Sequence, residues 1–118
     1  MRELLDEIFP ICRSITGSGV RSTLAIVGRT LPLMVHEVPS GTRVLDWVVP
    51  KEWNVKDAYV ADSTGRRIID FRASNLHVLN YSAPVRTRVT RSELDRHLHS
   101  LPDQPDVIPY RTSYYHET

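Results

Sequence analysis

The sequence predicts a small α+β fold, with an N-terminal helical segment, a mostly antiparallel β domain (a sandwich or partly open barrel) and a short helix. Apolar residues recur at helical spacing through residues 4–31. β-Branched or alternating stretches separated by turn residues fill residues 33–89. Thr90 and Glu93 make the pattern of a helix capping box. With 118 residues and 41% hydrophobic composition, the chain can form one core.

The helical segment is expected to contain two helices. Its first apolar stripe extends to Ile15, but Pro10 lacks an N–H and crowds the preceding turn, so the helix should kink or end there. A second helix to about residue 31 is predicted by an apolar face of Val20, Leu24, Val27 and Leu31. Thr16 or Ser18 is expected to cap its N-terminus.

The β domain is expected to contain five or six short strands. The candidate strands are residues 33–38, 43–49, 58–61, 66–71, 76–81 and 85–89. The sequence Asp62-Ser-Thr-Gly65 between two of them is a hairpin signal. The predicted core is Trp47, Val49, Tyr59, Ile69, Phe71, Val78 and Leu79, with Leu94 or Leu98 covering one end.

Charge and cysteine content restrict the classes of partner. The net charge of +1 provides no general attraction to nucleic acid or to anionic lipid, so neither is an expected partner. No apolar run is long enough for a membrane span, and the acidic N-terminus lacks the basic flank of a secretion signal. The single cysteine, Cys12, excludes an internal disulfide and suits a reducing compartment. The prediction is therefore a cytoplasmic protein.

Residues 11–20, "ICRSITGSGV", bring a thiol, hydroxyls and a G-x-G together before a helix. Gly17 and Gly19 would let backbone N–H groups face an anion at a helix N-terminus. The stretch lacks the lysine and the preceding strand of a P-loop, so a capped helix break is the favoured interpretation. Cys12 falls on the apolar stripe, where a buried hydrophobe is commoner than a nucleophile.

No catalytic or metal-binding set is predicted within this chain. His97 and His99 are two residues apart, so a helix would splay them, and spacings typical of zinc ligands are absent. Trp47, Trp53 and Tyr81 are candidate contacts for a peptide or glycan, although aromatic residues of a small β domain more often pack in its core.

Longer stretches of the sequence resemble the N-terminal part of a bacterial family of aminopeptidase-like proteins, and the resemblance covers essentially the whole chain. These stretches are "LDEIFPICRSITGSGVRSTL", "HEVPSGTRVLDWVVPKEWNVKDAYVAD", "IIDFRASNLHVLNYSAPV" and "HLHSLPDQPDVIPYRTSYY". The family, DUF4910, has a zinc-peptidase core of the M28 type with an inserted domain called DUF2172. Its members are often associated with surface-polysaccharide biosynthesis loci.

The resemblance implies a division of the chain. Residues 1–31 would be the first helices of the split peptidase-like core, residues 32–100 the inserted β-rich domain, and residues 101–118 an extended return segment. The family's metal ligands follow the last residue here, so no catalytic or metal-binding residue maps onto this chain. Zinc is implied for the full-length parent, and the expected partners are the rest of that polypeptide, including a winged helix, and a second copy in a homo-oligomer.

The implied function is that of a non-catalytic accessory fragment whose inserted domain shapes or caps the substrate cleft. Arg13 or Ser14 would then contact the substrate or the catalytic half. Two alternatives stay open: a stand-alone peptide- or glycan-binding β module, and a structural oligomerisation domain. If the fragment hypothesis holds, apolar residues near both ends should be exposed: Leu4, Leu5, Ile8, Phe9, Ile15, Val107, Ile108, Tyr114 and Tyr115.

Overall fold

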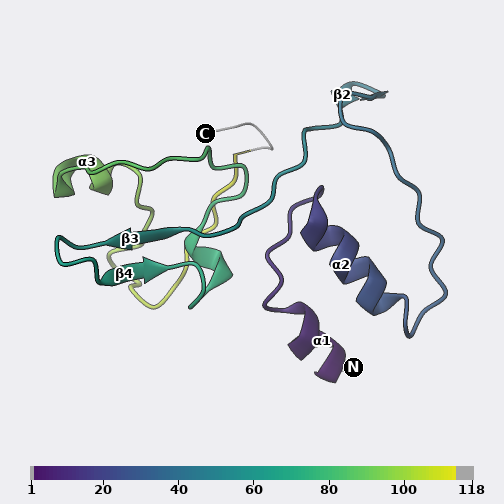
Figure 1. Cartoon of the computed structure of the whole chain (residues 1–118), viewed down its shortest axis with the longest axis horizontal. Coiled ribbons are helices and arrows are strands. Elements are labelled where there is room, and N and C mark those ends of the chain that lie inside the picture. Colours follow the sequence, from purple (N-terminus) through teal and green to yellow (C-terminus); the bar gives the residue numbers. More distant parts are fainter. Residues whose placement is uncertain (1, 114–118) are drawn as a thin grey trace. The chain divides into compact units, whose positions relative to one another are not determined.

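The computed structural model describes residues 2–113 and shows a few short helices and two separate antiparallel hairpins (Figure 1). The elements are α1 (Arg2–Ile8), α2 (Ser18–Val27), β1 (Arg43–Val44), β2 (Trp47–Val48), β3 (Tyr59–Ala61), β4 (Arg67–Asp70), the 3-10 helix η1 (Asn75–His77) and α3 (Arg91–Asp95). The predicted α+β class is confirmed, and the described strands form no closed barrel. The chain divides into two compact units, one ending at Val78 and one starting at Leu79.

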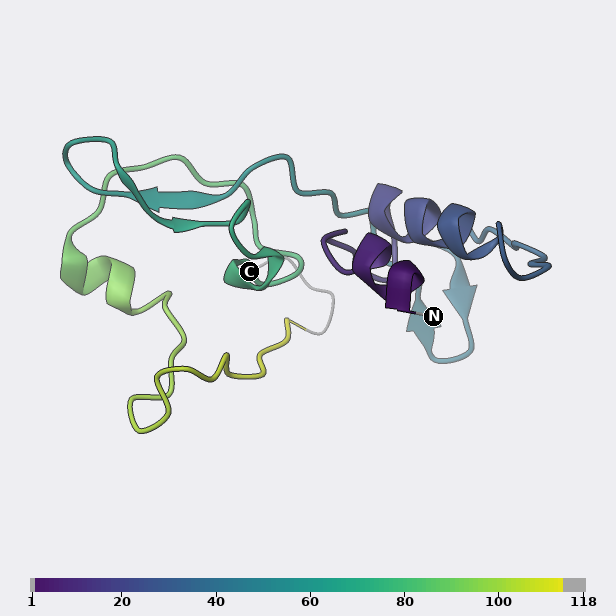
Figure 2. The ribbon, with the colours of Figure 1, turned by 90° about the horizontal axis from the view of Figure 1, so that it is seen from below.

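The two N-terminal helices form as the apolar spacing predicts and lie against each other (Figure 2). The first, α1, ends at Ile8, two residues before Pro10, which has no N–H to continue the helix. The second, α2, ends at Val27 and not near residue 31 as predicted. Turns follow it, and in the last of them Leu31 N donates to Val27 O (3.0 Å). An ion pair between Arg29 and Glu7 joins the end of α2 to α1.

The stretch over residues 43–49 is a hairpin rather than the single strand predicted for it. Strands β1 and β2 pair Arg43 with Val48 and Val44 with Trp47. The chain reverses at Leu45, whose φ of 56° lies in the left-handed region that non-glycine residues seldom adopt. Because this turn contains no glycine or proline, the alternating pattern runs through it without a break.

The hairpin of β3 and β4 confirms the turn signal at residues 62–65. The Asp62 carboxylate accepts hydrogen bonds from the N–H groups of Thr64 (2.9 Å) and Arg66 (3.1 Å), which is the local bonding that makes aspartate a turn residue. Gly65 supplies the positive φ of 88° that the turn needs. A register shift between Val60 and Ala61 bulges the ladder.

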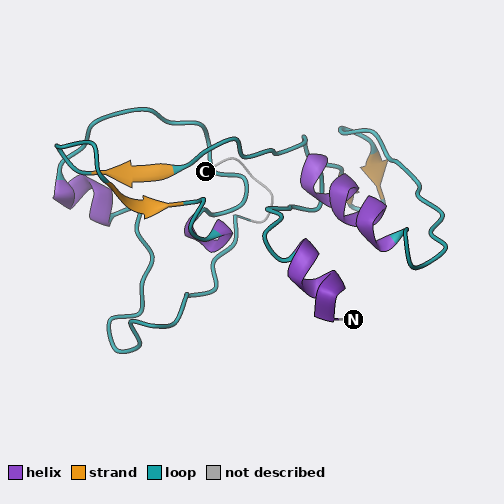
Figure 3. Cartoon of the chain, turned by 60° about the horizontal axis from the view of Figure 1, so that its bottom comes forward, coloured by secondary structure: helices purple, strands orange, loops and turns teal. Residues whose placement is uncertain are grey.

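Three of the predicted strands are absent from the described residues. Residues 33–38 and 85–89 are assigned to no strand, and residues 76–81 contain part of η1 instead (Figure 3). The expected five or six strands are therefore four in residues 2–113. High β-propensity describes how a side chain fits a pleated, half-buried surface, so it forms no strand where no neighbouring strand is present.

Burial is shallow across the described residues. Within residues 2–113, Tyr81 is the one large apolar residue that is buried, at 3% exposure. The predicted core is wrong for Trp47 and Tyr59, which are exposed at 44% and 55%, because the part of the chain that the structure describes provides no layer over their strands. The other predicted core residues are half-buried: Val49, Ile69, Phe71, Val78 and Leu79. Leu94 is half-buried and Leu98 is exposed.

The expected exposure of apolar residues near both ends is largely observed. Those exposed are Leu5, Phe9, Ile15, Val107 and Ile108. Leu4 and Ile8 are half-buried, and Tyr114 and Tyr115 lie outside the described residues. Such large side chains are normally covered in a folded protein, so these surfaces are suited to contact with another chain or segment.

The second unit contains α3 and extended segments. The predicted capping box is confirmed, because the Thr90 hydroxyl accepts from Glu93 N (3.3 Å) while the Glu93 carboxylate accepts from Thr90 N (2.7 Å). Ser113 Oγ donates to Asn80 O (2.9 Å) and so holds the segment after α3 near the start of the unit. None of the helices within residues 2–113 has the length and apolar character needed to cross a membrane.

Candidate functional site

The loop before α2 is held by a segment more than thirty residues further along the chain. Asn54 Oδ1 accepts hydrogen bonds from the backbone N–H of Ser18 (2.7 Å) and from Ser18 Oγ (2.6 Å). The expected caps, Thr16 and Ser18, are wrong: the N-cap residue is Gly17, which has no side chain to offer. Asn54 supplies the missing acceptor from outside the helix.

Arginine and glutamate extend this contact. Both terminal nitrogens of Arg21 donate to the Glu52 carboxylate, at 2.6 and 2.8 Å, in the bidentate geometry that matches the two groups. This pairing lowers the pKa of Glu52, a shift to which a hydrogen bond from Asn54 also contributes. We call the four residues Ser18, Arg21, Glu52 and Asn54 the Asn54 clamp.

Two glycines allow close backbone packing at the start of α2. Gly17 is buried with a φ of 98°, and a Cβ there would lie 2.7 Å from both Asn54 Oδ1 and Trp53 O. A Cβ on Gly19 would lie 2.2 Å from Cys12 O. The glycines therefore serve close backbone packing, and the Ser18 N–H that an anion would need is taken by Asn54. The structure favours the helix break over the anion cradle.

The predicted site residues Arg13 and Ser14 lie in the same loop. Arg13 Nη1 donates to Ile8 O (2.8 Å), so the side chain reaches back to the last residue of α1. Ser14 is buried, and its hydroxyl donates to Thr16 O (2.6 Å) and accepts from Thr16 N (3.2 Å). Burial raises the pKa of the neighbouring Cys12 thiol, which disfavours the thiolate that a nucleophile requires.

The three aromatic candidates are in different surroundings. Trp53 is half-buried beside Gly17, whereas Trp47 is exposed on β2. Tyr81 is buried in the second unit at a φ of 66°. Only Trp53 therefore joins Arg13 and Ser14 near the Asn54 clamp, and a substrate role for any of the five stays a prediction.

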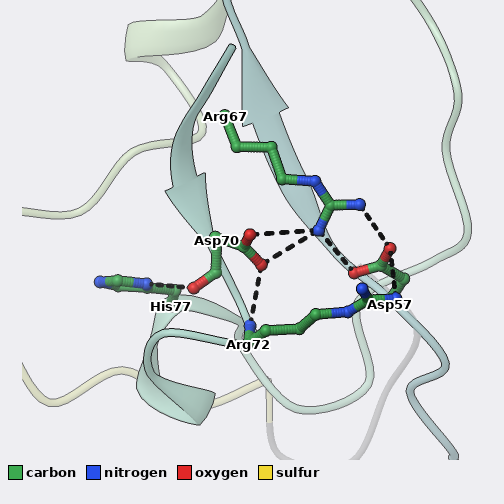
Figure 4. A network of polar contacts seen from close by, with 5 residues as sticks. All are labelled: Asp57, Arg67, Asp70, Arg72 and His77. Atoms are coloured by element: carbon green, nitrogen blue, oxygen red, sulfur yellow. Dashed lines mark hydrogen bonds and ion pairs between the residues drawn. The ribbon is translucent and has the colours of Figure 1, made fainter. Parts of the chain in front are cut away.

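A charged cluster on the β3–β4 hairpin was not predicted from the sequence (Figure 4). Arg67 lies between two carboxylates: its Nη2 donates to Asp57 Oδ2 (2.7 Å) and its Nη1 to Asp70 Oδ1 (3.1 Å). The guanidinium also stacks 3.9 Å from the centre of the Tyr59 ring. Hydrogen bonding from Arg67 lowers the pKa of Asp57, and bonding to both aspartates raises the pKa of Arg67.

The cluster also fixes the turn that follows β4. Asp70 Oδ1 accepts from Arg72 N (2.9 Å), and the Asp70 carbonyl lies 2.9 Å from His77 Nδ1 (Figure 4). Asp57 precedes β3 and Asp70 ends β4, so the hairpin register is what brings them to one arginine. A sequence search for acidic residues flanking both arms of the predicted hairpin would have found this pairing.

The described residues contain no group of three or more histidine, cysteine or acidic side chains placed to hold a metal ion. His97 follows α3, where its N–H donates to Leu94 O (2.8 Å). A pocket of about 200 Å³ is lined by Phe9, Pro10 and residues 71–75. Its two walls are joined by a hydrogen bond from Asn75 Nδ2 to Phe9 O (3.0 Å).

Comparison with known protein families identifies the family of the chain. Residues 52–118 match DUF2172, a domain of unknown function. The chain belongs to the DUF2172 family. The match begins at Glu52, so two members of the Asn54 clamp lie at the start of the DUF2172 match and two precede it. The predicted division at residues 31 and 100 stays a prediction.

A protein of Clostridium acetobutylicum is 58% identical to this DUF2172 chain over 114 residues. Its provisional name describes a polysaccharide biosynthesis protein with an aminopeptidase-like domain. The match covers 97% of this chain and 26% of the relative. A crystal structure from the same organism, provisionally named a peptidase, superposes with a TM-score of 0.92 at 57% identity, over 98% of this chain and 27% of that one. The resemblance to aminopeptidase-like proteins is thereby confirmed, and the chain spans about a quarter of each relative.

Proposed function

We propose that this chain is a non-catalytic accessory part of a zinc-dependent, aminopeptidase-like hydrolase, in which the DUF2172 domain shapes or caps the substrate cleft. The observation that carries the proposal is the 58% identity over 97% of the chain to a relative with an aminopeptidase-like domain, of which the chain spans only 26%. The rest of such a protein would supply the M28-type core of the DUF4910 family, including the metal ligands.

In this proposal the zinc ligands belong to the remainder of the longer protein. Zinc bound in the core would activate a water molecule for attack on a peptide or related amide carbonyl. The Asn54 clamp restrains the first turn of α2, which directly follows the loop that carries Arg13 and Ser14. These two residues would position the substrate or contact the catalytic half.

The proposal is tested by comparing residues 1–118 with the full-length clostridial relative. We expect the relative to bind zinc and hydrolyse an aminoacyl 4-nitroanilide, whereas the 118-residue chain should do neither. Zinc content by mass spectrometry and release of nitroaniline are the measurements. One tightly bound zinc per 118-residue chain, lost in the His97→Ala/His99→Ala variant, would contradict the proposal, as would a relative that hydrolyses no peptide or related amide.

The position of Arg13 is tested in a chimera in which residues 1–118 replace the matching quarter of the relative. Arg13→Ala should raise KM or lower kcat/KM, because a positioning residue acts on bound substrate. Arg86→Ala is the matched control, since Arg86 is also an exposed arginine and lies outside the loop. Equal kinetics for both variants would remove Arg13 from the cleft while leaving the accessory role intact.

A further inference from the structure

The pocket of about 200 Å³ lies between the residues that follow α1 and the turn that follows β4. Its apolar walls are Phe9, Pro10 and Phe71, and residues 72–75 complete the lining. All of these residues belong to the first compact unit. Phe9 is 72% exposed, so its ring is available to a ligand. The pocket is smaller than the roughly 300–1,000 Å³ that drug-sized ligands occupy, and it therefore suits a single residue of a ligand.

Arg72 is the one cationic residue of the lining, and its guanidinium is only loosely engaged. Among the described residues its side chain makes one polar contact, from Nη2 to Asp57 Oδ2 at 3.4 Å, and it is 69% exposed. Arg67 binds the same carboxylate at 2.7 and 3.1 Å and also bonds Asp70 (Figure 4). Because Arg67 supplies the short hydrogen bonds to both aspartates, Arg72 keeps donors for an anion in the pocket.

Two further polar side chains of the lining keep a group for a ligand. Ser74 Oγ accepts from Leu76 N (3.3 Å), and no residue in the described part of the chain accepts its hydroxyl proton. Asn75 Nδ2 donates to Phe9 O (3.0 Å), which fixes the orientation of the amide and leaves Oδ1 as an acceptor. The pocket thus offers two kinds of donor, the Arg72 guanidinium and a hydroxyl, together with one amide oxygen.

We infer that this pocket binds the C-terminal residue of a short peptide substrate whose last side chain is apolar. The inference rests on the proposed function, since the longer hydrolase supplies the catalytic centre. The carboxylate of that residue accepts hydrogen bonds from Arg72 and Ser74, and its amide N–H donates to Asn75 Oδ1. Its side chain packs against the rings of Phe9 and Phe71.

The charge of the lining favours a carboxylate over a phosphate or an uncharged sugar. One cation matches the single charge of a carboxylate, whereas a phosphate monoester carries nearly two charges at neutral pH. An uncharged ligand would leave the Arg72 guanidinium without an ion partner in the pocket. Aromatic walls beside a guanidinium also match an apolar side chain beside a carboxylate, which is the arrangement in the last residue of a peptide.

Calorimetric titration of the chimera with N-acetyl-L-phenylalanine and with its neutral amide tests the inference. The acid carries the carboxylate, the amide N–H and the aromatic side chain, and it has no N-terminal amine at which an aminopeptidase could act. We expect the acid to bind about 10- to 100-fold more tightly than the amide, the usual effect of a hydrogen bond to a charged group. Equal affinities, no binding of the acid, or tighter binding of inorganic phosphate than of the acid overturns the inference.

Matched substitutions show whether the pocket holds the acid. Arg72→Gln should abolish the preference for the acid, whereas Arg66→Gln should keep it. Arg66 is the control because it is also exposed (77%) and also lies 3.4 Å from an aspartate, Asp62, on the same hairpin, but it does not line the pocket. A preference that survives Arg72→Gln, or that both variants lose equally, contradicts the inference.

Kinetics separate the pocket from the proposed function. In the chimera, Arg72→Gln should raise KM for alanyl-alanyl-phenylalanine about 10-fold or more but leave KM for the same peptide ending in an amide unchanged. Equal KM values for the variant and the parent chimera overturn the inference and leave the proposed function intact. A chimera that binds the acid through Arg72 but hydrolyses neither peptide supports the pocket and contradicts the proposed function.

Discussion

At the scale of single residues, the cap of α2 is the feature with the clearest energetic consequence. Asn54 accepts two hydrogen bonds from Ser18 and is itself bonded to Glu52. We expect Asn54→Ala to lower the free energy of unfolding by about 0.5–2 kcal/mol, the usual range for loss of an N-terminal cap. Chemical denaturation measures this change in the free energy of unfolding. Asn54→Asp, which keeps the acceptor oxygen, is the control. Equal loss in both variants would show that the amide nitrogen is the more important group.

Gly17 makes a second prediction at this scale. Its positive φ and the nearby Trp53 carbonyl both oppose a side chain. Gly17→Ala should therefore destabilise the chain by more than the roughly 1–3 kcal/mol that a strained backbone conformation alone would cost. Gly41→Ala is the matched control, because Gly41 has a φ of 86° but nothing within 4 Å of its Cβ position. An equal decrease in the unfolding midpoint for the two variants would contradict the close packing at Gly17.

At the scale of elements, the sequence was sufficient wherever a single turn or cap determines the structure. Pro10 ends α1 because it has no N–H to donate. Asp62 builds the β3–β4 turn, and Thr90 with Glu93 starts α3, through hydrogen bonds to near neighbours in the chain. Predictions were wrong where no residue type marks a turn or where a strand needs a partner from a distant segment. The alternation over residues 43–49 hides the turn at Leu45, because no glycine marks it.

The candidate site was only partly predictable for the same reason. The stretch around Arg13 and Ser14 was identified from composition, but its partners Glu52 and Asn54 are 31 and 36 residues away from Arg21 and Ser18. The Arg67 cluster depends on the hairpin register. Neither contact leaves a signal in local periodicity, which reports only on neighbours in the sequence.

The β3–β4 hairpin should show a pH dependence that originates in its ion pairs. Bonding to Arg67 lowers the pKa of Asp57 below its unfolded value near 4. The carboxylate therefore stabilises the folded state above that value, and this contribution disappears as the pH falls through the lower folded pKa. Asp57→Asn should flatten the loss of stability below about pH 4, measured by urea unfolding. Asp46→Asn, an exposed aspartate in the other hairpin, is the control.

At the scale of the whole molecule, the main feature is the number of large apolar side chains that are exposed to solvent. Apolar side chains are exposed in both units, with Leu5 and Phe9 in the first and Val107 and Ile108 in the second. We expect the 118-residue chain to bind a hydrophobic fluorescent dye and to self-associate as its concentration rises. The clostridial relative should do neither. A strictly monomeric chain that binds no dye would contradict the accessory role.

The Asn54 clamp has a consequence for how this module can be inherited and transplanted. The DUF2172 match begins at Glu52, yet Glu52 and Asn54 bind residues that precede that boundary. A recombination event that moved residues 52–118 alone would leave the loop before α2 without its restraint, and would deprive Glu52 and Asn54 of the donors on Arg21 and Ser18. We therefore expect selection to favour recombination events that transfer the N-terminal helices and the DUF2172 domain together as one unit.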